Sequence, residues 1–339
     1  MMYQWFRPLL FRFDPERMHR LALNLLRLAE RLPPARKLLR SWFAAPARPI
    51  DIFGLTFNNP VGLAAGYDKD GLAWRGLACL GFGHIEIGTV TLQPQPGNPQ
   101  PRLFRLPEDQ ALINRMGFPG RGAAFVARRL QGRLIPGLVL GVNLGMNKHT
   151  RLEEAASDYL NLFDIFAPLA DYLAVNVSSP NTVGLRRLQA RQALEGLLSA
   201  LARRRSEWQA GSGRGIPILV KLAPDLEDAE LDDALAALMN HGMDGVIAAN
   251  TTLSREGVRS LQAGESGGLS GEPLRQRSTR MVKEIFQRTQ GRLPIIGVGG
   301  ISCAAHAREK LEAGATLVQV YTGLVYGGPG LVKNIQMGL

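Results

Sequence analysis

Short apolar runs alternate with longer segments of helical periodicity from about residue 59 to the end of the chain. Each run is long enough for a strand, and each is followed by enough residues for a helix. Eight runs can be recognised, beginning at Val61, His84, Leu138, Tyr172, Pro217, Gly245, Pro294 and Thr316. Repeated strand–helix units are typical of parallel sheets, and eight of them predict an α/β fold of the (β/α)8 TIM barrel type. We expect residues 49–339 to form this barrel, with Phe53–Asn58 as a small hairpin strand closing its bottom.

The first 48 residues follow a different pattern. Apolar residues recur at helical spacing in two stretches, from Trp5 to Phe13 and from Met18 to Leu32. Pro15 suits the first turn of the second helix, and the pair Pro33-Pro34 would end it. Residues 1–48 therefore predict an N-terminal extension of two short amphipathic helices.

Positive charge is concentrated in the same extension. The chain carries a net charge of +11, and residues 1–48 supply +7 of it from ten basic and three acidic side chains. The apolar faces of such helices either pack on the main domain or lie in a membrane surface, and the aromatic tip and the excess charge favour the membrane. A nucleic-acid partner is disfavoured, because no nucleic-acid-binding motif is present and the remaining basic residues alternate with acidic ones.

Several classes of protein are excluded by composition and motif. Cys79 and Cys303 are too few for a disulfide framework and are expected to be core residues of a protein in a reducing, cytosolic setting. The longest apolar runs fall short of the roughly 18 residues of a spanning helix. Arg7, Arg12 and Asp14 interrupt the apolar residues near the start before a secretory signal forms, so we expect the N-terminus to be retained. A dinucleotide-binding fingerprint and a phosphate-binding P-loop are both missing.

The expected carboxyl ends of the strands carry amides, lysines and hydroxyls. In a barrel of this kind the chemistry lies at that end. The residues there include Lys69, Thr89, Asn143, Asn176, Lys221, Asn250, Tyr321 and Thr322. Facing carboxylate pairs and metal-ligand sets are nearly absent, so neither glycoside hydrolysis nor a metal site is expected. Neutral amides beside two lysines suit a planar, amide-rich anion such as a heterocyclic carboxylate.

A glycine-rich loop follows the seventh predicted strand. The sequence GVGGIS from Gly297 precedes a helix, which places bare backbone amides where a phosphate would bind. The sequence GLSG from Gly268 provides a further stretch of backbone that could approach the phosphate closely. Together with the lysines and amides, these loops indicate a bound mononucleotide cofactor.

An ordered series of longer motifs runs through the chain. They are AAGYDKDG from Ala64, IEIGTVT from Ile85, PRLFRL from Pro101, INRMGF from Ile113, NVSSPNTVGLR from Asn176, VKLAPD from Val220, ANTT from Ala249, GGLSGEPL from Gly267 and PIIGVGGI from Pro294. With DPERMHRL from Asp14, the chain resembles the membrane-associated, quinone-dependent class 2 dihydroorotate dehydrogenases over essentially its whole length. The resemblance implies that FMN oxidises (S)-dihydroorotate to orotate in pyrimidine biosynthesis and passes the electrons to ubiquinone or a related quinone. It also implies a peripheral protein on the cytoplasmic face of the cell membrane, and we expect a monomer.

The same resemblance assigns roles to individual residues. Ser179 would be the base that removes the C5 proton, where a soluble relative uses cysteine, and its activation would need a closed site with a water or Thr182 as relay. Residues expected to hold dihydroorotate are Lys69, Asn114, Arg115, Met116, Gly117, Phe118, Asn176, Asn181, Asn250 and Thr251. Those expected at FMN are Ala65, Gly66, Tyr67, Asp68, Lys69, Thr89, Asn143, Asn176, Lys221, Ala249, Gly271, Gly300, Tyr321 and Thr322. Residues resembling the lining of a quinone tunnel are His19, Arg102 and Tyr321.

Two of the expected flavin contacts have specific consequences, and two alternative functions remain open. Lys221 would stabilise the negative charge that develops on the reduced flavin ring. Ala249 stands where some relatives have threonine, so any flavin contact there must come from backbone. A different FMN barrel, such as a dihydropyrimidine or dihydrouridine reductase, would share the phosphate loop. A membrane-binding module with an inert barrel is the alternative from another functional class.

Overall fold

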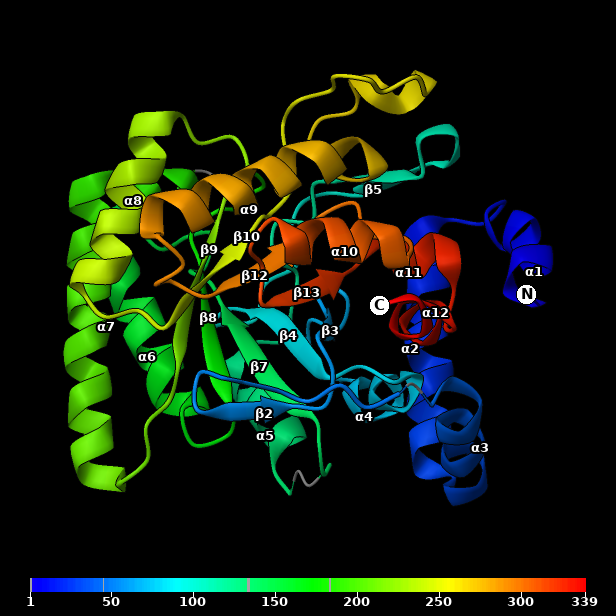
Figure 1. Ribbon diagram of the computed structural model, residues 1–339, viewed down its shortest axis with the longest axis horizontal. Helices are drawn as coiled ribbons and strands as arrows, with labels where there is room; N and C mark the ends of the chain where they lie inside the picture. Colours follow the sequence, from blue (N-terminus) through cyan, green and yellow to red (C-terminus); the bar gives the residue numbers. More distant parts are fainter. Residues whose placement is uncertain (1, 45, 133–134, 183) are drawn as a thin grey trace.

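Eight parallel strands close into a barrel surrounded by helices in the computed structural model, which describes residues 2–44, 46–132, 135–182 and 184–339 (Figure 1). Around the barrel the order is β10-β12-β13-β3-β4-β7-β8-β9. The strands are β3 (Val61–Leu63), β4 (His84–Val90), β7 (Val139–Leu144), β8 (Tyr172–Asn176), β9 (Ile218–Leu222), β10 (Gly245–Ala248), β12 (Ile295–Val298) and β13 (Leu317–Val320). Every one lies in a predicted run, and the (β/α)8 barrel is confirmed.

Apolar runs without alternation form these strands because both of their faces are covered. Every residue of β4, β7, β8 and β9 is buried. Side chains on one face fill the interior of the barrel, where Tyr172, Leu219 and Ile296 pack together. Side chains on the other face pack against the helices. The barrel is therefore a filled core, and space for a ligand is confined to its ends.

Helices follow the strands and cover the outside of the barrel (Figure 1). They are α4 (Trp74–Leu77), α5 (Ala123–Leu130), α6 (Ala155–Phe166), α7 (Arg191–Ser212), α8 (Asp228–Asn240), α9 (Arg275–Thr289), α10 (Ala304–Glu312), α11 (Thr322–Gly327) and α12 (Leu331–Gly338). Short 3-10 helices are η1 (Ala78–Leu80), η2 (Pro107–Asp109), η3 (Leu152–Glu154), η4 (Leu185–Gln189), η5 (Leu261–Gly264) and η6 (Glu272–Leu274). In α8 the buried residues Leu231, Leu235 and Leu238 recur every three or four positions, which turns one apolar stripe toward the strands.

An antiparallel hairpin closes the bottom of the barrel. Its strands are β1 (Ile50–Ile52) and β2 (Leu55–Phe57), joined by a turn at Phe53 and Gly54. Both turn residues have positive φ, a conformation that glycine adopts without strain. Phe57 is fully buried among the interior side chains of the barrel. The predicted closure is thus present, although Phe53 lies in the turn and not in a strand.

A second small sheet was not foreseen from the sequence. Its three antiparallel strands are β5 (Leu103–Leu106), β6 (Ala111–Asn114) and β11 (Gly268–Gly271), in the order β11-β6-β5. The strand β11 pairs with β6 although Gly268 and its partner Asn114 are far apart in the chain. This sheet brings two loops of the barrel together over one end of it.

The N-terminal extension forms three helices, whereas two were predicted. They are α1 (Met2–Leu10), α2 (Pro15–Arg31) and α3 (Pro33–Phe43). Pro33 ends α2 as predicted, but it also starts α3, because proline is well suited to the first position of a helix. The Asp14 side chain caps α2 by accepting a hydrogen bond from the Arg17 amide at 2.8 Å.

These helices stand at one side of the barrel, beside α4, α11 and α12 (Figure 1). Only part of their apolar surface packs there: Leu23 is buried, and Leu26 packs against the core. Large apolar side chains that remain exposed are Trp5, Phe6, Leu9, Phe13, Leu21, Leu25, Leu28, Leu32, Leu38 and Trp42. Within the described parts of the chain, no helix combines the length and the apolar character needed to cross a membrane.

The two cysteines differ in environment. Cys79 is buried in η1, as predicted. Cys303 is exposed at the start of α10, so its assignment to the core was wrong. The helical pattern of that segment did not show that its first residue faces solvent.

Candidate functional site

A cavity of about 940 Å³, partly open to solvent, lies at the carboxyl ends of the barrel strands. Its walls come from the ends of seven barrel strands, from the loops that follow them and from the small sheet. Predicted residues that line it are Ala65, Gly66, Lys69, Thr89, Asn114, Met116, Gly117, Phe118, Asn176, Ser179, Asn181, Lys221, Ala249, Asn250, Thr251, Gly271, Gly300, Tyr321 and Thr322.

Four of the residues predicted to hold dihydroorotate or FMN lie outside this lining. Arg115 turns away and forms an ion pair with Glu265 at 2.6 Å. Asp68 caps the segment after β3 by accepting hydrogen bonds from the amides of two following residues, and burial raises its pKa to about 6. Tyr67 packs between α2 and Tyr321. Asn143 lies behind Thr89.

A buried network of amides and hydroxyls connects the cavity with the interior of the barrel. Asn176 Nδ2 donates to Thr89 Oγ1 at 2.9 Å, and the Thr89 hydroxyl donates to Asn143 Oδ1 at 2.6 Å. Asn143 Nδ2 in turn donates to Glu86 at 2.8 Å. Glu86 also accepts from the Tyr172 hydroxyl at 3.0 Å and from Gln319 Nε2 at 2.9 Å. This network in the barrel interior therefore holds the side chains of Thr89 and Asn176 in one orientation at the cavity wall.

Two lysines bring positive charge to the cavity. Lys69 Nζ donates to the Gly66 carbonyl at 2.8 Å, and desolvation lowers the pKa of Lys69 to about 8. Burial also lowers the pKa of Lys221, while the nearby Glu86 charge opposes this effect. Among the described residues, Lys221 Nζ has no hydrogen-bond partner in the protein. An anionic or electron-rich ligand would supply one.

Ser179 lies in the loop after β8 and is buried. Its Oγ accepts a hydrogen bond from the backbone N–H of Asn181 at 3.2 Å. The preceding residue is fixed to the β10 loop, because Asn250 Nδ2 donates to Ser178 Oγ at 2.8 Å. The Thr182 hydroxyl is buried and has no partner in the part of the chain that the structure describes. The loop therefore presents the desolvated Ser179 hydroxyl to the cavity, whereas the buried Thr182 hydroxyl lies outside the lining.

Backbone without side chains forms the wall after β12. Gly299 and Gly300 both have positive φ, at 114° and 69°. A side chain at Gly300 would collide with Arg275, so the loop reaches the cavity only as glycine. Gly271, at the end of β11, also lines the cavity and has positive φ, at 104°. This arrangement is suited to close contact with a phosphate.

Of the three residues predicted for a quinone tunnel, His19 lies in α2, Arg102 pairs with α2, and Tyr321 lines the cavity. His19 Nε2 donates to the Tyr67 carbonyl at 2.7 Å, and burial lowers the pKa of His19 to about 4. The Tyr67 ring contacts both the His19 ring and the Tyr321 ring edge to face, with centroids 4.8 Å and 5.6 Å apart. Arg102 is bound to α2 through Glu16 at 2.8 Å. A row of rings thus connects α2 with the cavity wall at Tyr321.

Some site residues were missed in the sequence. Gln319 lines the cavity from inside β13, and Glu86 supports it from inside β4. A polar residue within an apolar strand was the signal for both. Ser270, Leu274 and Ile301 also line the cavity; they belong to the motifs GGLSGEPL and PIIGVGGI but were not singled out within them.

Comparisons with known proteins agree with this geometry. The family model for dihydroorotate dehydrogenase matches residues 49–339. A dihydroorotate dehydrogenase (quinone) of Anaeromyxobacter dehalogenans is 51% identical over 345 residues, which cover 100% of this chain and 92% of the relative. That of Thiobacillus denitrificans is 51% identical over 335 residues, with 98% of each covered. The crystal structure of DHODH in complex with ferulenol from Eimeria tenella has a TM-score of 0.85 at 37% identity, covering 96% of this chain and 90% of that one.

Proposed function

Because the chain belongs to the dihydroorotate dehydrogenase family, we propose that the cavity at the carboxyl ends of its strands is where dihydroorotate is oxidised. The chain is a quinone-dependent dihydroorotate dehydrogenase of pyrimidine biosynthesis, and its family uses a flavin cofactor. The observation that carries the proposal is the convergence of Lys69, Lys221 and Ser179 on one cavity lined by amides.

The residues present suit FMN as that flavin. Bare backbone at Gly299 and Gly300 suits its phosphate, and Lys221, which lacks a partner among the described side chains, suits its ring. Bound flavin would accept the hydride that leaves C6 of dihydroorotate. Lys221 would stabilise negative charge on the ring, and the buried network behind Thr89 and Asn176 keeps that wall in place. Further residues proposed to hold FMN are Ala65, Gly66, Ala249, Gly271, Tyr321 and Thr322.

Dihydroorotate is proposed to bind between Lys69 and the amide side chains. The Lys69 ammonium offers a point charge to the carboxylate of the substrate. Amides of Asn114, Asn176, Asn181 and Asn250 provide both donors and acceptors for the edges of its ring. Met116, Gly117, Phe118 and Thr251 complete this part of the wall.

Ser179 is proposed to remove the C5 proton. Its burial keeps bulk water from competing for that proton. When Ser179 takes the C5 proton it must give up its own hydroxyl proton. The Thr182 hydroxyl, buried and without a protein partner in the described chain, is our candidate for relaying that proton to a water molecule. Serine needs such help, because its hydroxyl alone is a weak base.

Residues 1–48 are proposed to form a membrane and quinone segment attached to a barrel of residues 49–339. The exposed apolar side chains of α1, α2 and α3 support contact with a membrane surface. His19, Arg102 and Tyr321 are proposed to line the path of the quinone to the flavin. We further propose a monomer bound peripherally to the cytoplasmic face of the membrane.

Anaerobic flavin reduction tests the proposal. The protein is reconstituted with FMN and mixed with dihydroorotate in a stopped-flow spectrometer. We expect the flavin absorbance to bleach with formation of orotate, and a quinone to restore it. A colourless protein, or a flavin that bleaches with dihydrouracil but not with dihydroorotate, would contradict the proposal.

A further inference from the structure

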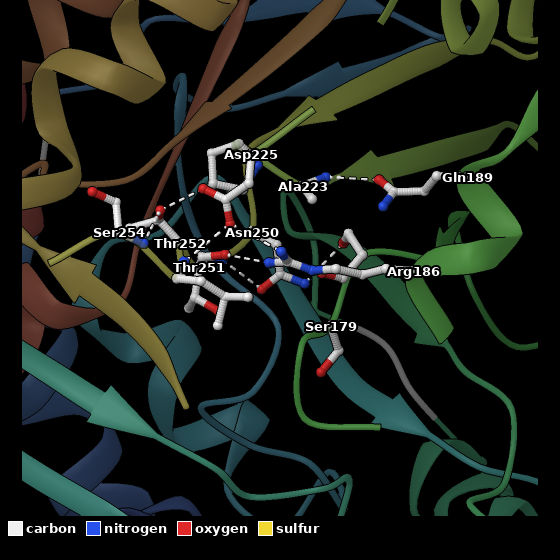
Figure 2. Close-up of polar contacts among 12 residues, drawn as sticks. Ser179, Arg186, Gln189, Ala223, Asp225, Asn250, Thr251, Thr252 and Ser254 are labelled. Atoms are coloured by element: carbon white, nitrogen blue, oxygen red, sulfur yellow. Dashed lines mark hydrogen bonds and ion pairs between the residues drawn. The ribbon is translucent and has the colours of Figure 1, made fainter. Parts of the chain in front are cut away.

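One arginine binds three loops beside the cavity (Figure 2). Arg186 lies in η4, shortly after Ser179. Its Nε donates to the Ser178 carbonyl at 3.2 Å, and its Nη2 donates to the Thr251 carbonyl at 3.0 Å. Its Nη1 donates to the Asp225 carboxylate at 2.9 Å. These partners follow β8, β10 and β9 respectively, so one guanidinium joins three neighbouring strand ends.

Asp225 continues the connection to the β10 loop. Its Oδ1 accepts from the Thr252 hydroxyl at 2.5 Å, and its Oδ2 accepts from the Leu253 amide at 3.0 Å. The side chains of Arg186 and Asp225 are only 23% and 18% exposed. The pair is thus largely shielded from water, and Asp225 has a second ionic partner in Arg277 at 3.5 Å, so its charge stays paired when Arg186 is replaced.

A second contact ties the same loops together. Gln189, also in η4 and buried, accepts a hydrogen bond from the Ala223 amide at 2.9 Å through its side-chain oxygen (Figure 2). The segment that follows Ser179 is therefore attached to the β9 loop at two places, Asp225 and Ala223. Its position over the cavity is set by these contacts and not by the local sequence alone.

The two carbonyls that Arg186 binds adjoin proposed site residues. The Ser178 carbonyl shares a rigid peptide plane with the Ser179 amide, so holding one fixes the orientation of the other. The Thr251 carbonyl is held in the same way, and Asn250 and Thr251 line the cavity. Arg186 itself is not among the residues that line it.

We propose that Arg186 is a positioning residue, which holds the Ser179 loop and the Asn250–Thr251 segment in a fixed relation through its contacts with Ser178, Thr251 and Asp225. The inference rests on the proposed function, because it takes Ser179 as the base and Asn250 and Thr251 as substrate contacts. Three different nitrogens of one planar group are used. A lysine has a single ammonium on a flexible stem and cannot reproduce this geometry.

The first test compares the two half-reactions of Arg186→Lys and Asp225→Asn. We expect the limiting rate of flavin reduction by saturating dihydroorotate to fall by about 10- to 100-fold in Arg186→Lys, because small misplacements of reacting groups have effects of this size. Asp225→Asn removes the carboxylate charge but keeps a hydrogen-bond acceptor for Arg186, so its rate of flavin reduction should fall less than that of Arg186→Lys. Flavin content and reoxidation by a quinone should stay unchanged in both.

Arg191→Gln is the matched control. Arg191 begins α7, is 65% exposed, and pairs with Asp233 at 3.4 Å, so it is an arginine in an ion pair close in sequence but on the surface. Its reduction rate should equal that of the wild type. A rate in Arg186→Lys equal to that of the control would overturn the proposal. So would an equal loss in both half-reactions, which indicates a merely structural role.

A second test needs no turnover. Arg187 is exposed, and trypsin cleavage after it reports how often the loop opens. We expect cleavage to be about tenfold faster in Asp225→Asn and Arg186→Lys than in the wild type and Arg191→Gln, in proportion to the open population. Equal cleavage in all four proteins would overturn the proposal. If Arg186→Lys does not fold, Asp225→Asn gives the result.

The outcome for the wild type separates this inference from the proposed function. A wild-type flavin that dihydroorotate does not bleach contradicts the function, whatever the variants do. A wild type that is bleached, with variants that reduce equally fast and are cleaved equally slowly, contradicts only the role of Arg186.

Discussion

Lys69 and Lys221 place two positive charges in a cavity whose remaining lining is uncharged. Desolvation lowers the pKa of both lysines, because burial disfavours their charged forms. A negatively charged ligand reverses this penalty, since the ammonium then interacts with an opposite charge. The cavity therefore selects an anion over a neutral analogue, and its preference depends on the protonation of Lys69.

The pKa of Lys69 leads to a prediction for pH dependence. Below a pH of about 8, Lys69 is protonated and attracts the carboxylate of dihydroorotate, while above it the free enzyme loses this charge. We expect affinity for dihydroorotate to fall as pH rises through this value, by at most about tenfold per unit. The concentration dependence of flavin reduction measures it. Lys69→Met should bind more weakly and without this dependence, and a flat wild-type profile would refute the idea.

Ser179 is the other residue whose role can be measured directly. Ser179→Ala should retain flavin and slow its reduction by dihydroorotate by about 10²- to 10⁴-fold, the usual contribution of a general base. Reoxidation of chemically reduced enzyme by a quinone should not change, since Ser179 acts on the substrate side. Ser179→Cys, which keeps a group able to accept a proton, should lose less activity at high pH. A normal reductive rate in Ser179→Ala would exclude Ser179 as the base.

At the scale of elements, the N-terminal helices divide their surface between two environments. Leu23 and Leu26 pack against the barrel, whereas Leu21, Leu25 and Leu28 are exposed on the same helix. A surface with so many exposed apolar side chains marks an interaction site. Within the proposed function, that partner is the membrane that holds the quinone.

Leu25→Glu tests this assignment. A glutamate at this exposed position should reduce vesicle binding and turnover with a long-tailed quinone by about tenfold or more, since a buried leucine contributes about 1.5–3 kcal/mol. Flavin reduction by dihydroorotate should stay normal. Leu261→Glu is the control, because Leu261 is fully exposed in η5, outside the N-terminal extension. Equal vesicle binding by both variants would contradict the assignment.

At the scale of the whole molecule, acidic and basic side chains of the N-terminal helices lie on different sides. Two acidic residues of α2 face the barrel: Glu16 pairs with Arg102 at 2.8 Å and Glu30 with Arg129 at 3.3 Å. Basic residues of the same helix, among them Arg17, remain exposed. Arg7 and Arg27 are only partly exposed, but most basic residues of the extension are presented outward, together with the exposed apolar side chains.

This distribution predicts a preference for anionic lipids. Binding to vesicles with anionic headgroups should exceed binding to neutral vesicles, at about 1 kcal/mol per basic residue near the surface. The difference should shrink as salt rises from about 0.05 M to about 0.5 M, because the Debye length shortens. Co-sedimentation with both kinds of vesicle measures it. Equal binding to both at low salt would show that the charge has no part in association.

The sequence by itself determined the features that depend on local pattern. Apolar runs between helical segments located all eight barrel strands, because a strand covered on both faces has to be apolar. Residues at the ends of those runs converge on the cavity, because parallel strands end on one side of a barrel. The N-terminal helices were recognised by their periodicity, although the start of α3 at Pro33 was read only as an end.

Only the tertiary structure decided which distant residues meet and which way side chains point. The pairing of β11 with β6, and the contacts of Glu86 with Gln319 and of Arg186 with Asp225, join segments without a shared local pattern. Arg115 belongs to a motif of cavity residues, yet its side chain turns to Glu265. The physical reason is that periodicity fixes the face of an element, whereas long-range contacts and loop paths depend on the whole fold.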